Sequence, residues 1–385
     1  MSEKRGFDVQ QARHLMADVD VMLINSAPNF VYATGIYDPT ILMLMVEGRF
    51  ENFAIIPKES EPVLLINNGI TENAKEMSWI KDIRTTPTGA WIYRLKKQED
   101  FADSTAGGIV KILEERGLTR RRIGIEKWSM SVDMYEQLKG NLPEAQFCDI
   151  EGVFSNLRYH KTDEEVTRLR RAAEITERGI EAAMAVVREG ASDYDIVKEF
   201  KSSIAGEGAD LFFANCHIGP PGGKGLSSPC GHKIEKGDII CLDVGARYKS
   251  YAADLCRTAV VGEASDKLAK LYAALLNAQR KGIEAIRPGV KLSNIYKIIG
   301  EAVRAGGYPD YRRSMFGHSI GLECEEPPFI SATADEIFEP NMVYCIEVPW
   351  YEPNWGSVSV EDTILITKDG YSEVSTIPRG LRIIK

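Results

Sequence analysis

Long hydrophobic runs are missing from this sequence of 385 residues. The longest apolar run lies near Ile41–Val46 and is far shorter than the roughly 20 residues that a membrane-spanning helix needs. The first residues, Met1–Arg5, lead into polar sequence and do not form the pattern of a secretory signal. We therefore expect a cytoplasmic protein that has no membrane partner.

Paired cysteine spacings and an excess of basic residues are also missing. The seven cysteines include no CxxC pair, and several lie in apolar runs such as Ile239–Leu242, so we predict reduced core thiols rather than a zinc finger. The net charge of −9 has the wrong sign for most nucleic-acid binders, and the basic cluster Arg120–Arg122 lies among acidic residues. We therefore expect no nucleic-acid partner.

The first part of the chain alternates short apolar runs with helical patterns and contains no phosphate-binding loop. Ala102–Arg116 has helical spacing, and Gly107 and Gly108 lie inside this pattern rather than after a strand. The predicted strands are Val21–Ile24, Ile41–Val46, Phe53–Ile56, Val63–Ile66 and Ile123–Ile125. This order predicts an α/β domain of about 150 residues.

A long helix marks the beginning of a second domain. Thr162 and Glu165 form a capping-box pattern, and the apolar spacing that follows continues to a stop at Gly190. We place the boundary near residue 155, which gives domains 1–155 and 156–385. In the second domain, the predicted helices are Ser265–Ile286 and Leu292–Ala305, and the predicted strands are Asp238–Ala246, Ala252–Val261, Met342–Val348 and Ser357–Thr367.

Four acidic residues lie in these apolar strands, where an unpaired carboxylate is costly to bury. They are Asp243, Asp254, Glu347 and Glu361. Taken singly, each could end a strand or form a salt bridge, and one arginine could offset one or two of them. Taken together, they predict a shared pair of divalent cations, because such a pair offsets all four charges.

One histidine completes a possible ligand set. His318 lies between the two strand pairs, and the glycines on either side of it permit the close backbone approach of a ligand-bearing turn. Oxygen-rich sites with one imidazole suit Mn²⁺, Fe²⁺, Co²⁺ or Zn²⁺. The residues therefore predict two divalent ions without identifying the metal.

These residues lie in motifs that resemble the catalytic domain of the pita-bread metallohydrolases, which include aminopeptidase P, prolidase, methionine aminopeptidase and the creatinases. Order and spacing both match. The matching motifs are Leu242–Gly245, Ala253–Thr258, Gly317–Leu322, Ile346–Glu347 and Val360–Thr363. The segment His160–Glu165 is similar to the family's entry into this domain, and the first domain resembles the creatinase-type N-terminal domain in size and strand–helix order.

The resemblance implies an α/β (α+β) fold in which a creatinase-type N-terminal α/β domain precedes a pita-bread catalytic domain. It also implies a metal-binding hydrolase, similar to aminopeptidase P, in which two ions such as manganese share a bridging hydroxide. The implied ligands are Asp243, Asp254, His318, Glu347 and Glu361. Oligomers are usual in the family, so we expect a homodimer.

The residues that handle the peptide in the family's peptidases are not matched. Non-ligand histidines of those enzymes correspond to Leu226, Ser314 and Glu325 here, and an arginine corresponds to Ser359. We therefore expect a non-standard member of the family, in which the metal site is kept and the peptide-handling residues are replaced. His217 is one of the few histidines left in the region of the first motif.

Glu325 is the predicted catalytic residue, as general acid or base in place of a histidine. If the segment before Pro327 is extended, Glu325 and Glu326 point to opposite sides. Only Glu325 would then face the substrate.

The predicted substrate contacts are Leu226, Ser314, Trp350 and Tyr351. The aromatic residues could cage a cationic or flat ligand, or could equally pack a loop or dimer face. The main hypothesis is a hydrolase that uses the bridging hydroxide to cleave an amide-type C–N bond of a small molecule or short peptide. The alternatives are a Xaa-Pro aminopeptidase or dipeptidase, a metal-dependent lyase of the dimethylsulfoniopropionate-cleaving type, and a catalytically silent binding protein.

Overall fold

The computed structural model describes residues 7–48, 51–87 and 100–385, which form two compact units, Met1–Arg158 and Tyr159–Lys385. The expected boundary near residue 155 falls inside helix α7 (Glu151–Tyr159). Within the described ranges, no helix combines the length and the apolar composition that a membrane span requires. The seven cysteines are all free, and four of them are buried.

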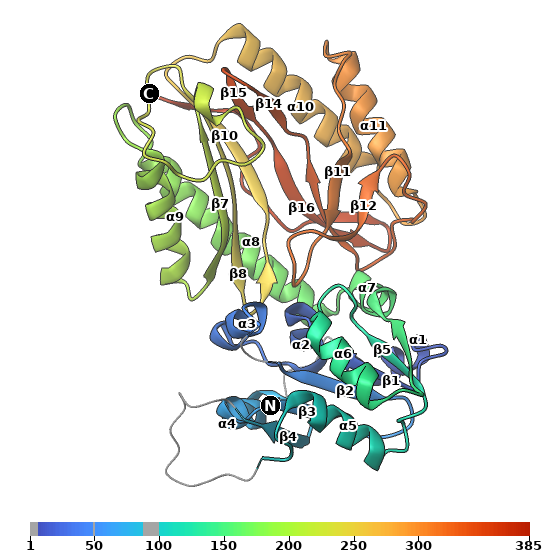
Figure 1. Ribbon diagram of the computed structural model, residues 1–385. Helices are drawn as coiled ribbons and strands as arrows, with labels where there is room; N and C mark the ends of the chain where they lie inside the picture. The colour runs from blue at the N-terminus through green and yellow to red at the C-terminus, as the bar shows by residue number, and fades with distance from the viewer. Residues whose placement is uncertain (1–6, 49–50, 88–99) are drawn as a thin grey trace. The chain divides into compact units, whose positions relative to one another are not determined.

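The N-terminal unit is a six-stranded mixed sheet in the order β4-β3-β2-β1-β5-β6 (Figure 1). Its strands are β1 (Val21–Ile24), β2 (Phe53–Pro57), β3 (Val63–Asn67), β4 (Asp82–Thr86), β5 (Arg122–Ile125) and β6 (Gln146–Asp149). Besides α7, its helices are α1 (Val9–Leu15), α2 (Ala27–Thr34), α3 (Pro39–Val46), α4 (Thr71–Met77), α5 (Thr105–Glu115) and α6 (Val132–Asn141).

The strand predicted at Ile41–Val46 is wrong, because this segment belongs to helix α3. Asp38 caps the helix by accepting hydrogen bonds from the backbone N–H groups of Thr40 and Ile41, and Pro39 occupies the first helical position. Both features favour a helix start. A short apolar run carries too little periodicity to distinguish a strand from a helix, so the cap decided the outcome.

The C-terminal unit is built on a ten-stranded sheet whose main path is β12-β11-β13-β16-β10-β8-β7. Its strands are β7 (Asp210–Ile218), β8 (Ile239–Tyr248), β9 (Tyr251–Ala252), β10 (Leu255–Val261), β11 (Met315–Ser319), β12 (Glu326–Ser331), β13 (Val343–Glu347), β16 (Glu361–Thr367), β17 (Gly370–Glu373) and β18 (Arg382–Ile384). A separate hairpin pairs β14 (Trp350–Glu352) with β15 (Gly356–Val358). The helices are α8 (Asp163–Ala185), α9 (Asp193–Gly206), α10 (Asp266–Ala285) and α11 (Leu292–Ala305).

The capping box predicted at the start of the long helix α8 is confirmed. The Thr162 side chain accepts a hydrogen bond from the backbone of Glu165, and the Glu165 carboxylate accepts one from the backbone N–H of Thr162. Helices α8 and α9 then bury Ile180 and Phe200 in one core with Leu242 of β8. Burial of each such side chain is worth roughly 1.5–3 kcal/mol.

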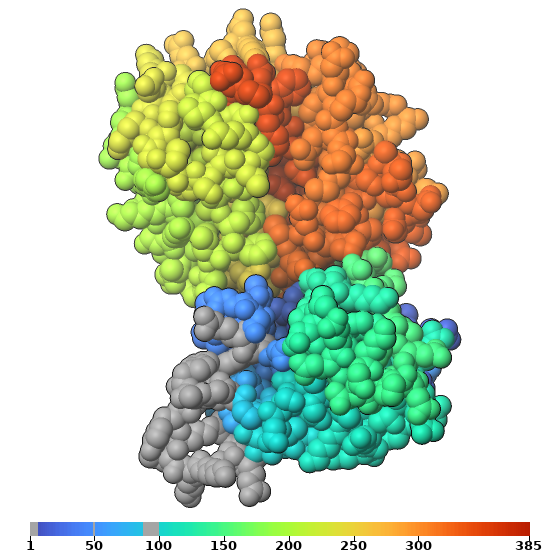
Figure 2. Space-filling model, in the orientation of Figure 1, coloured from blue at the N-terminus to red at the C-terminus, as the bar shows by residue number. Residues whose placement is uncertain are grey.

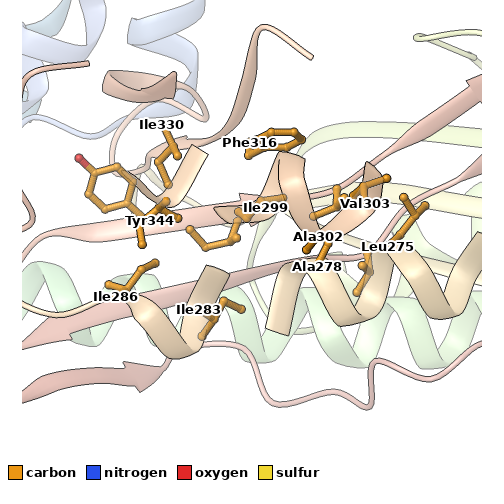
Figure 3. Close-up of a cluster of buried hydrophobic side chains, with 14 of the residues drawn as sticks. Leu275, Ala278, Ile283, Ile286, Ile299, Ala302, Val303, Phe316, Ile330 and Tyr344 are labelled. Atoms are coloured by element: carbon orange, nitrogen blue, oxygen red, sulfur yellow. The ribbon is translucent and has the colours of Figure 1, made fainter. Parts of the chain in front are cut away.

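Helices α10 and α11 cover the other half of the sheet. Leu275 and Ile283 of α10 and Ile299 of α11 share a core with Tyr344 of β13, and Figure 3 shows these side chains between helices and strands. Successive residues of a strand point to opposite faces. The residues that alternate with this core, such as Cys345 on β13, therefore belong to the face that the helices leave open.

Candidate metal centre

One row of polar side chains crosses five strands on the face of the sheet opposite the helices. Residues that pair directly on neighbouring strands share a face. The row consists of Asn215 on β7, Asp243 on β8, Cys256 on β10, Glu361 on β16 and Glu347 on β13. The strand register thus brings together three of the predicted ligands that are far apart in the sequence.

His318 joins the row from β11, where it pairs with Cys345. Its Nε2 lies 3.7 Å from Oδ2 of Asp254, which immediately precedes β10, and 4.0 Å from Oε1 of Glu361. The expectation that His318 lies in a turn is wrong, because it is a strand residue. The neighbouring glycine is nevertheless required: Gly317 has φ +150°, and a Cβ there would lie 2.1 Å from the carbonyl oxygen of Cys345.

The most compact group of potential ligands also contains a thiol. Among the described residues, ligand atoms of Asp254, His318, Cys345 and Glu361 all lie within 4.8 Å of one another, and all four residues are buried. Glu347 and Asp243 are not part of this compact group. A set of two carboxylates, one imidazole and one sulfur is chemically suited to a divalent transition metal.

The carboxylates of the row lie in an environment that disfavours their charge. Burial raises the pKa of Asp243 and of Glu361 well above the usual range, and the neighbouring carboxylates raise both further. Burial also raises the pKa of Asp254 and of Glu347, although His318 opposes the rise at Asp254 and Arg313 opposes it at Glu347. Nearby positive charge would restore the ionised forms of all four.

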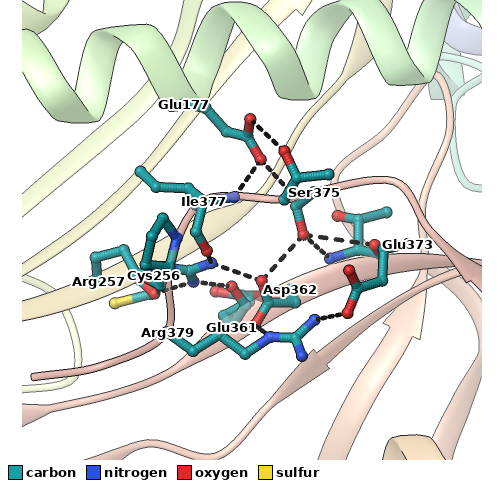
Figure 4. A network of polar contacts seen from close by, with 12 residues as sticks. Glu177, Cys256, Arg257, Glu361, Asp362, Glu373, Ser375, Ile377 and Arg379 are labelled. Carbon is teal, nitrogen blue, oxygen red and sulfur yellow. Dashed lines mark hydrogen bonds and ion pairs between the residues drawn. The ribbon is translucent and has the colours of Figure 1, made fainter.

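Asp362 is a buried acid of the same sheet that is neutralised by arginines of the protein. It follows Glu361 on β16 and is fully buried, with its carboxylate 2.6 Å from Arg257 and 2.8 Å from Arg379 (Figure 4). Gln279 and Ser375 donate further hydrogen bonds to it. Within the described ranges, the ion pairs of Asp243, Asp254 and Glu361 include no lysine or arginine. These three acids therefore lack the protein cations that neutralise Asp362.

A cavity of about 590 Å³ opens onto these acids. Its lining runs from residues 212–226 to residues 313–325, and Figure 2 shows a furrow between the corresponding yellow-green and orange parts of the C-terminal unit. The lining residues are Phe212, Phe213, Asn215, Gly225, Leu226, Asp243, Asp254, Arg313, Met315, His318, Cys324, Glu325, Glu347, Tyr351 and Glu361. The cavity thus combines a charged floor with apolar and aromatic walls.

The structure brings some of the predicted substrate contacts to this cavity and not others. Leu226 and Tyr351 line it, whereas Ser314 is exposed and is not among the lining residues. Trp350 lines a second cavity and stacks on Tyr311, with ring centroids 5.8 Å apart. Trp350 and Tyr351 are adjacent on strand β14, so their side chains point to opposite sides.

Glu325 and Glu326 differ as the extended segment predicts. Glu325 is exposed and lines the cavity. Glu326 is buried, and its Oε2 lies 3.2 Å from Nζ of Lys161, which also donates to the hydroxyl of Ser319. The buried ion pair holds the strand that begins next to Glu325.

Several cavity residues were not predicted from the sequence. The most notable is Arg313, whose Nη2 lies 3.3 Å from each carboxylate oxygen of Glu347. Cys324 donates a hydrogen bond of 2.9 Å to Asp254, and Asn215 hydrogen-bonds Asp243. The position of Arg313, five residues before His318, was a usable signal, since a cation so near a ligand motif is a candidate partner for the acids.

The chemistry of the cavity floor suits divalent cations. Oδ1 of Asp254 is buried and has no hydrogen-bond partner among the described groups. Three carboxylates and one imidazole around it can all act as ligands through oxygen or nitrogen. A buried acceptor without a donor is costly unless a cation or water satisfies it.

The raised pKa values of the cavity acids predict how the metal-free protein responds to pH. An acid whose pKa is higher in the folded state keeps its proton there above the pH at which the unfolded chain has lost it, so the free energy of unfolding falls as pH rises through that interval. In chelator, we expect Glu361→Gln to stabilise the protein relative to wild type, and this advantage should grow between about pH 5 and pH 8. Urea denaturation of both proteins measures the difference. An advantage that shrinks with rising pH would contradict the assigned direction.

Comparisons with known proteins agree with this geometry. A model described as metallopeptidase family M24 matches residues 167–368, and one described as the creatinase/prolidase N-terminal domain matches residues 9–160. The Xaa-Pro dipeptidase of Pyrococcus furiosus is 32% identical over 265 residues, which cover 67% of this chain and 75% of that protein.

Solved structures give the same result. The prolidase from Pyrococcus horikoshii OT3 has a TM-score of 0.84 at 27% identity, with 97% of this chain and 99% of that chain covered. The Xaa-Pro dipeptidase from Bacillus anthracis has a TM-score of 0.86 at 25% identity, with 98% and 99% covered. The expected fold, a creatinase-type N-terminal domain followed by a pita-bread catalytic domain, is confirmed.

Proposed function

Because the chain belongs to metallopeptidase family M24, we propose that it is a metal-dependent hydrolase that cleaves an amide-type C–N bond of a small substrate. One observation carries this proposal. Four carboxylates and one imidazole meet at a cavity floor, and among the described residues no lysine or arginine pairs with three of these acids, Asp243, Asp254 and Glu361.

We propose that this floor holds two divalent ions, and that Mn²⁺, Fe²⁺, Co²⁺ and Zn²⁺ are the candidates. The proposed ligands are Asp243, Asp254, His318, Glu347 and Glu361. A bound pair of such ions supplies a nucleophile at neutral pH and polarises the bond to be cleaved. The protein's own contribution is to fix the ligands on strands of one sheet, or directly before a strand in the case of Asp254, which sets their spacing.

The remaining cavity residues would bind and orient the substrate. Phe212, Phe213 and Tyr351 offer partly buried apolar surface beside the acids, and Leu226 lines the more exposed part of the cavity. Glu325 is the exposed carboxylate beside the floor, and it would accept or donate a proton at the substrate nitrogen. The cavity volume of about 590 Å³ suits a small molecule or a short peptide.

A Xaa-Pro dipeptidase is the second candidate, and the names of the relatives favour it. The positions Leu226, Ser314 and Glu325 oppose it, since they replace the imidazoles expected of the family's peptidases. We also propose that the protein is a cytoplasmic homodimer and that its metal is manganese.

We expect weak activity on Xaa-Pro dipeptides. Each lost acid–base group is worth roughly 10²–10⁴ in rate. A panel of Xaa-Pro dipeptides and of small amides, assayed with each of the four metals, measures the preference. A kcat above about 10 s⁻¹, the typical enzyme value, on a simple Xaa-Pro dipeptide would favour the second candidate.

A further inference from the structure

A second cavity, of about 510 Å³, adjoins the metal cavity in the C-terminal unit. It is lined by two short segments, residues 307–313 and 349–351, and it shares Arg313 and Tyr351 with the lining of the metal cavity. A group bound beside Arg313 in the second cavity is therefore a neighbour of a group bound over the acids. The proposed hydrolysis so far uses only the metal cavity.

The second cavity has an aromatic wall whose rings are held in place. Trp350 contacts Tyr308 edge to face, with ring centroids 5.3 Å apart, and it stacks on Tyr311. Nε1 of Trp350 donates a hydrogen bond of 3.1 Å to Glu352, and the Tyr311 hydroxyl donates one of 2.7 Å to the carbonyl of Pro349. Because these contacts fix the rings before a ligand arrives, a flat apolar group can pack against them at a low cost in side-chain entropy.

The charge of the second cavity is opposite to that of the metal cavity. Arg312 and Arg313 both line it, and Asp310 is the one acid among the described residues of its lining. In the metal cavity the balance is reversed, because the proposed acidic ligands line it. An anionic group is therefore favoured in the second cavity and disfavoured over the metal-free acids.

Both guanidinium groups have donors that the protein does not use. Nη1 of Arg312 donates hydrogen bonds of 2.8 Å to the carbonyls of Pro309 and Tyr311, which fixes the side chain, and its Nε and Nη2 remain free among the described residues. Nη2 of Arg313 contacts Glu347, while its Nε is buried and has no hydrogen-bond partner among the described groups. A planar guanidinium matches the geometry of a carboxylate, so unused donors of this kind suit a carboxylate ligand.

We propose that the second cavity binds the far end of the substrate, and that this end combines a flat ring with a carboxylate. The ring packs on Trp350 and Tyr308, and the carboxylate accepts hydrogen bonds from Arg312 and Arg313. The amide bond to be cleaved lies over the acids of the metal cavity. The inference rests on the proposed hydrolase function and deepens it, because it names the substrate class as amides that end in an aromatic carboxylate.

The test titrates three probes into chelator-treated protein and follows the NMR signals of isotope-labelled tryptophan side chains. Phenylacetate has both ring and charge, phenylacetamide lacks the charge, and acetate lacks the ring. The chelator prevents a carboxylate from binding to a metal ion instead. The indole signal of Trp350, assigned by its loss in Trp350→Phe, should move with phenylacetate. Phenylacetate should bind at least about tenfold more tightly than either other probe, because charge-assisted hydrogen bonds are among the strongest in proteins.

Arg312→Met should weaken phenylacetate binding at least about tenfold and leave phenylacetamide binding unchanged. Arg312 is exposed, so its loss leaves no buried group behind. Arg280→Met is the matched control: this arginine of α10 lies 3.8 Å from Glu284 and lines neither cavity, so all affinities should stay at their wild-type values. Equal binding of phenylacetate and phenylacetamide, or phenylacetate binding that Arg312→Met leaves unchanged, would overturn the inference.

A second measurement connects the cavity to the reaction. In metal-loaded protein, phenylacetate should raise KM for the best amide of the panel and leave kcat unchanged, and Arg312→Met should remove most of this inhibition. Inhibition that leaves KM unchanged would overturn the assignment to the substrate. Amide hydrolysis without any phenylacetate binding would overturn the inference and still support the proposed function. Phenylacetate binding at Trp350 without hydrolysis of any amide would overturn the proposed function alone.

Discussion

Glu361→Gln should remove metal and activity together. We expect metal content to fall below the two ions per chain proposed for wild type and activity to fall at least about 100-fold, because bound ions supply several kcal/mol of charge stabilisation. In the row, Glu361 lies between Cys256 on one side and Glu347 on the other. Elemental analysis and a rate assay on the best substrate of the panel measure the two losses. Full activity in metal-free protein would contradict the metal dependence.

The adjacent acid is the natural contrast, because it points to the other face of β16. Asp362→Asn should leave the cavity intact but lower stability by about 3–5 kcal/mol, the cost of breaking a buried ion pair. Arg257 and Arg379 would lose the carboxylate that they share. Adding metal should raise the melting temperature of folded Asp362→Asn and not that of Glu361→Gln. If both variants lose metal equally, the assignment of the two faces is wrong.

Glu325→Gln should lower activity at least about 100-fold while the metals and the fold are retained, the low end for a lost general acid or base. The amide keeps the shape of the side chain and cannot exchange the proton. Glu325 lines the cavity and is exposed, so the change leaves no buried partner behind. Steady-state kinetics on the substrate from the panel, with metal content checked in parallel, measures the effect.

Glu323→Gln is a better control than a change at Glu326. Glu323 lies in the same loop and does not line the cavity, whereas Glu326 is buried against Lys161 and its neutralisation would disturb the fold. Near-native kinetics of Glu325→Gln would show that the proton moves elsewhere. His217 would then be tested first: it is buried, its Nδ1 lies 3.0 Å from the Gly222 carbonyl, and its Nε2 has no hydrogen-bond partner among the described residues.

The sequence by itself determined the features that depend on local pattern. The pattern of Thr162 and Glu165 predicts the start of α8, because a capping box needs only four consecutive residues. Asp243, Glu347 and Glu361 stand out because an acid after an apolar strand is costly unless something offsets it. Their motifs also identified the family, since order and spacing survive where overall identity is low.

Only the tertiary structure decided which side chains meet at the cavity. Strand register sets the row that joins Asn215 to Asp243, and no local pattern encodes the register between β7 and β8. Arg313 in the loop before β11 lines the cavity and Ser314 is exposed, although the two are neighbours in sequence. Tertiary structure also distinguishes Glu361 from Asp362, which are adjacent acids on one strand. Glu361 faces the cavity, whereas Asp362 faces Arg257. Long-range packing therefore makes Glu361 a candidate ligand and Asp362 part of a structural ion pair.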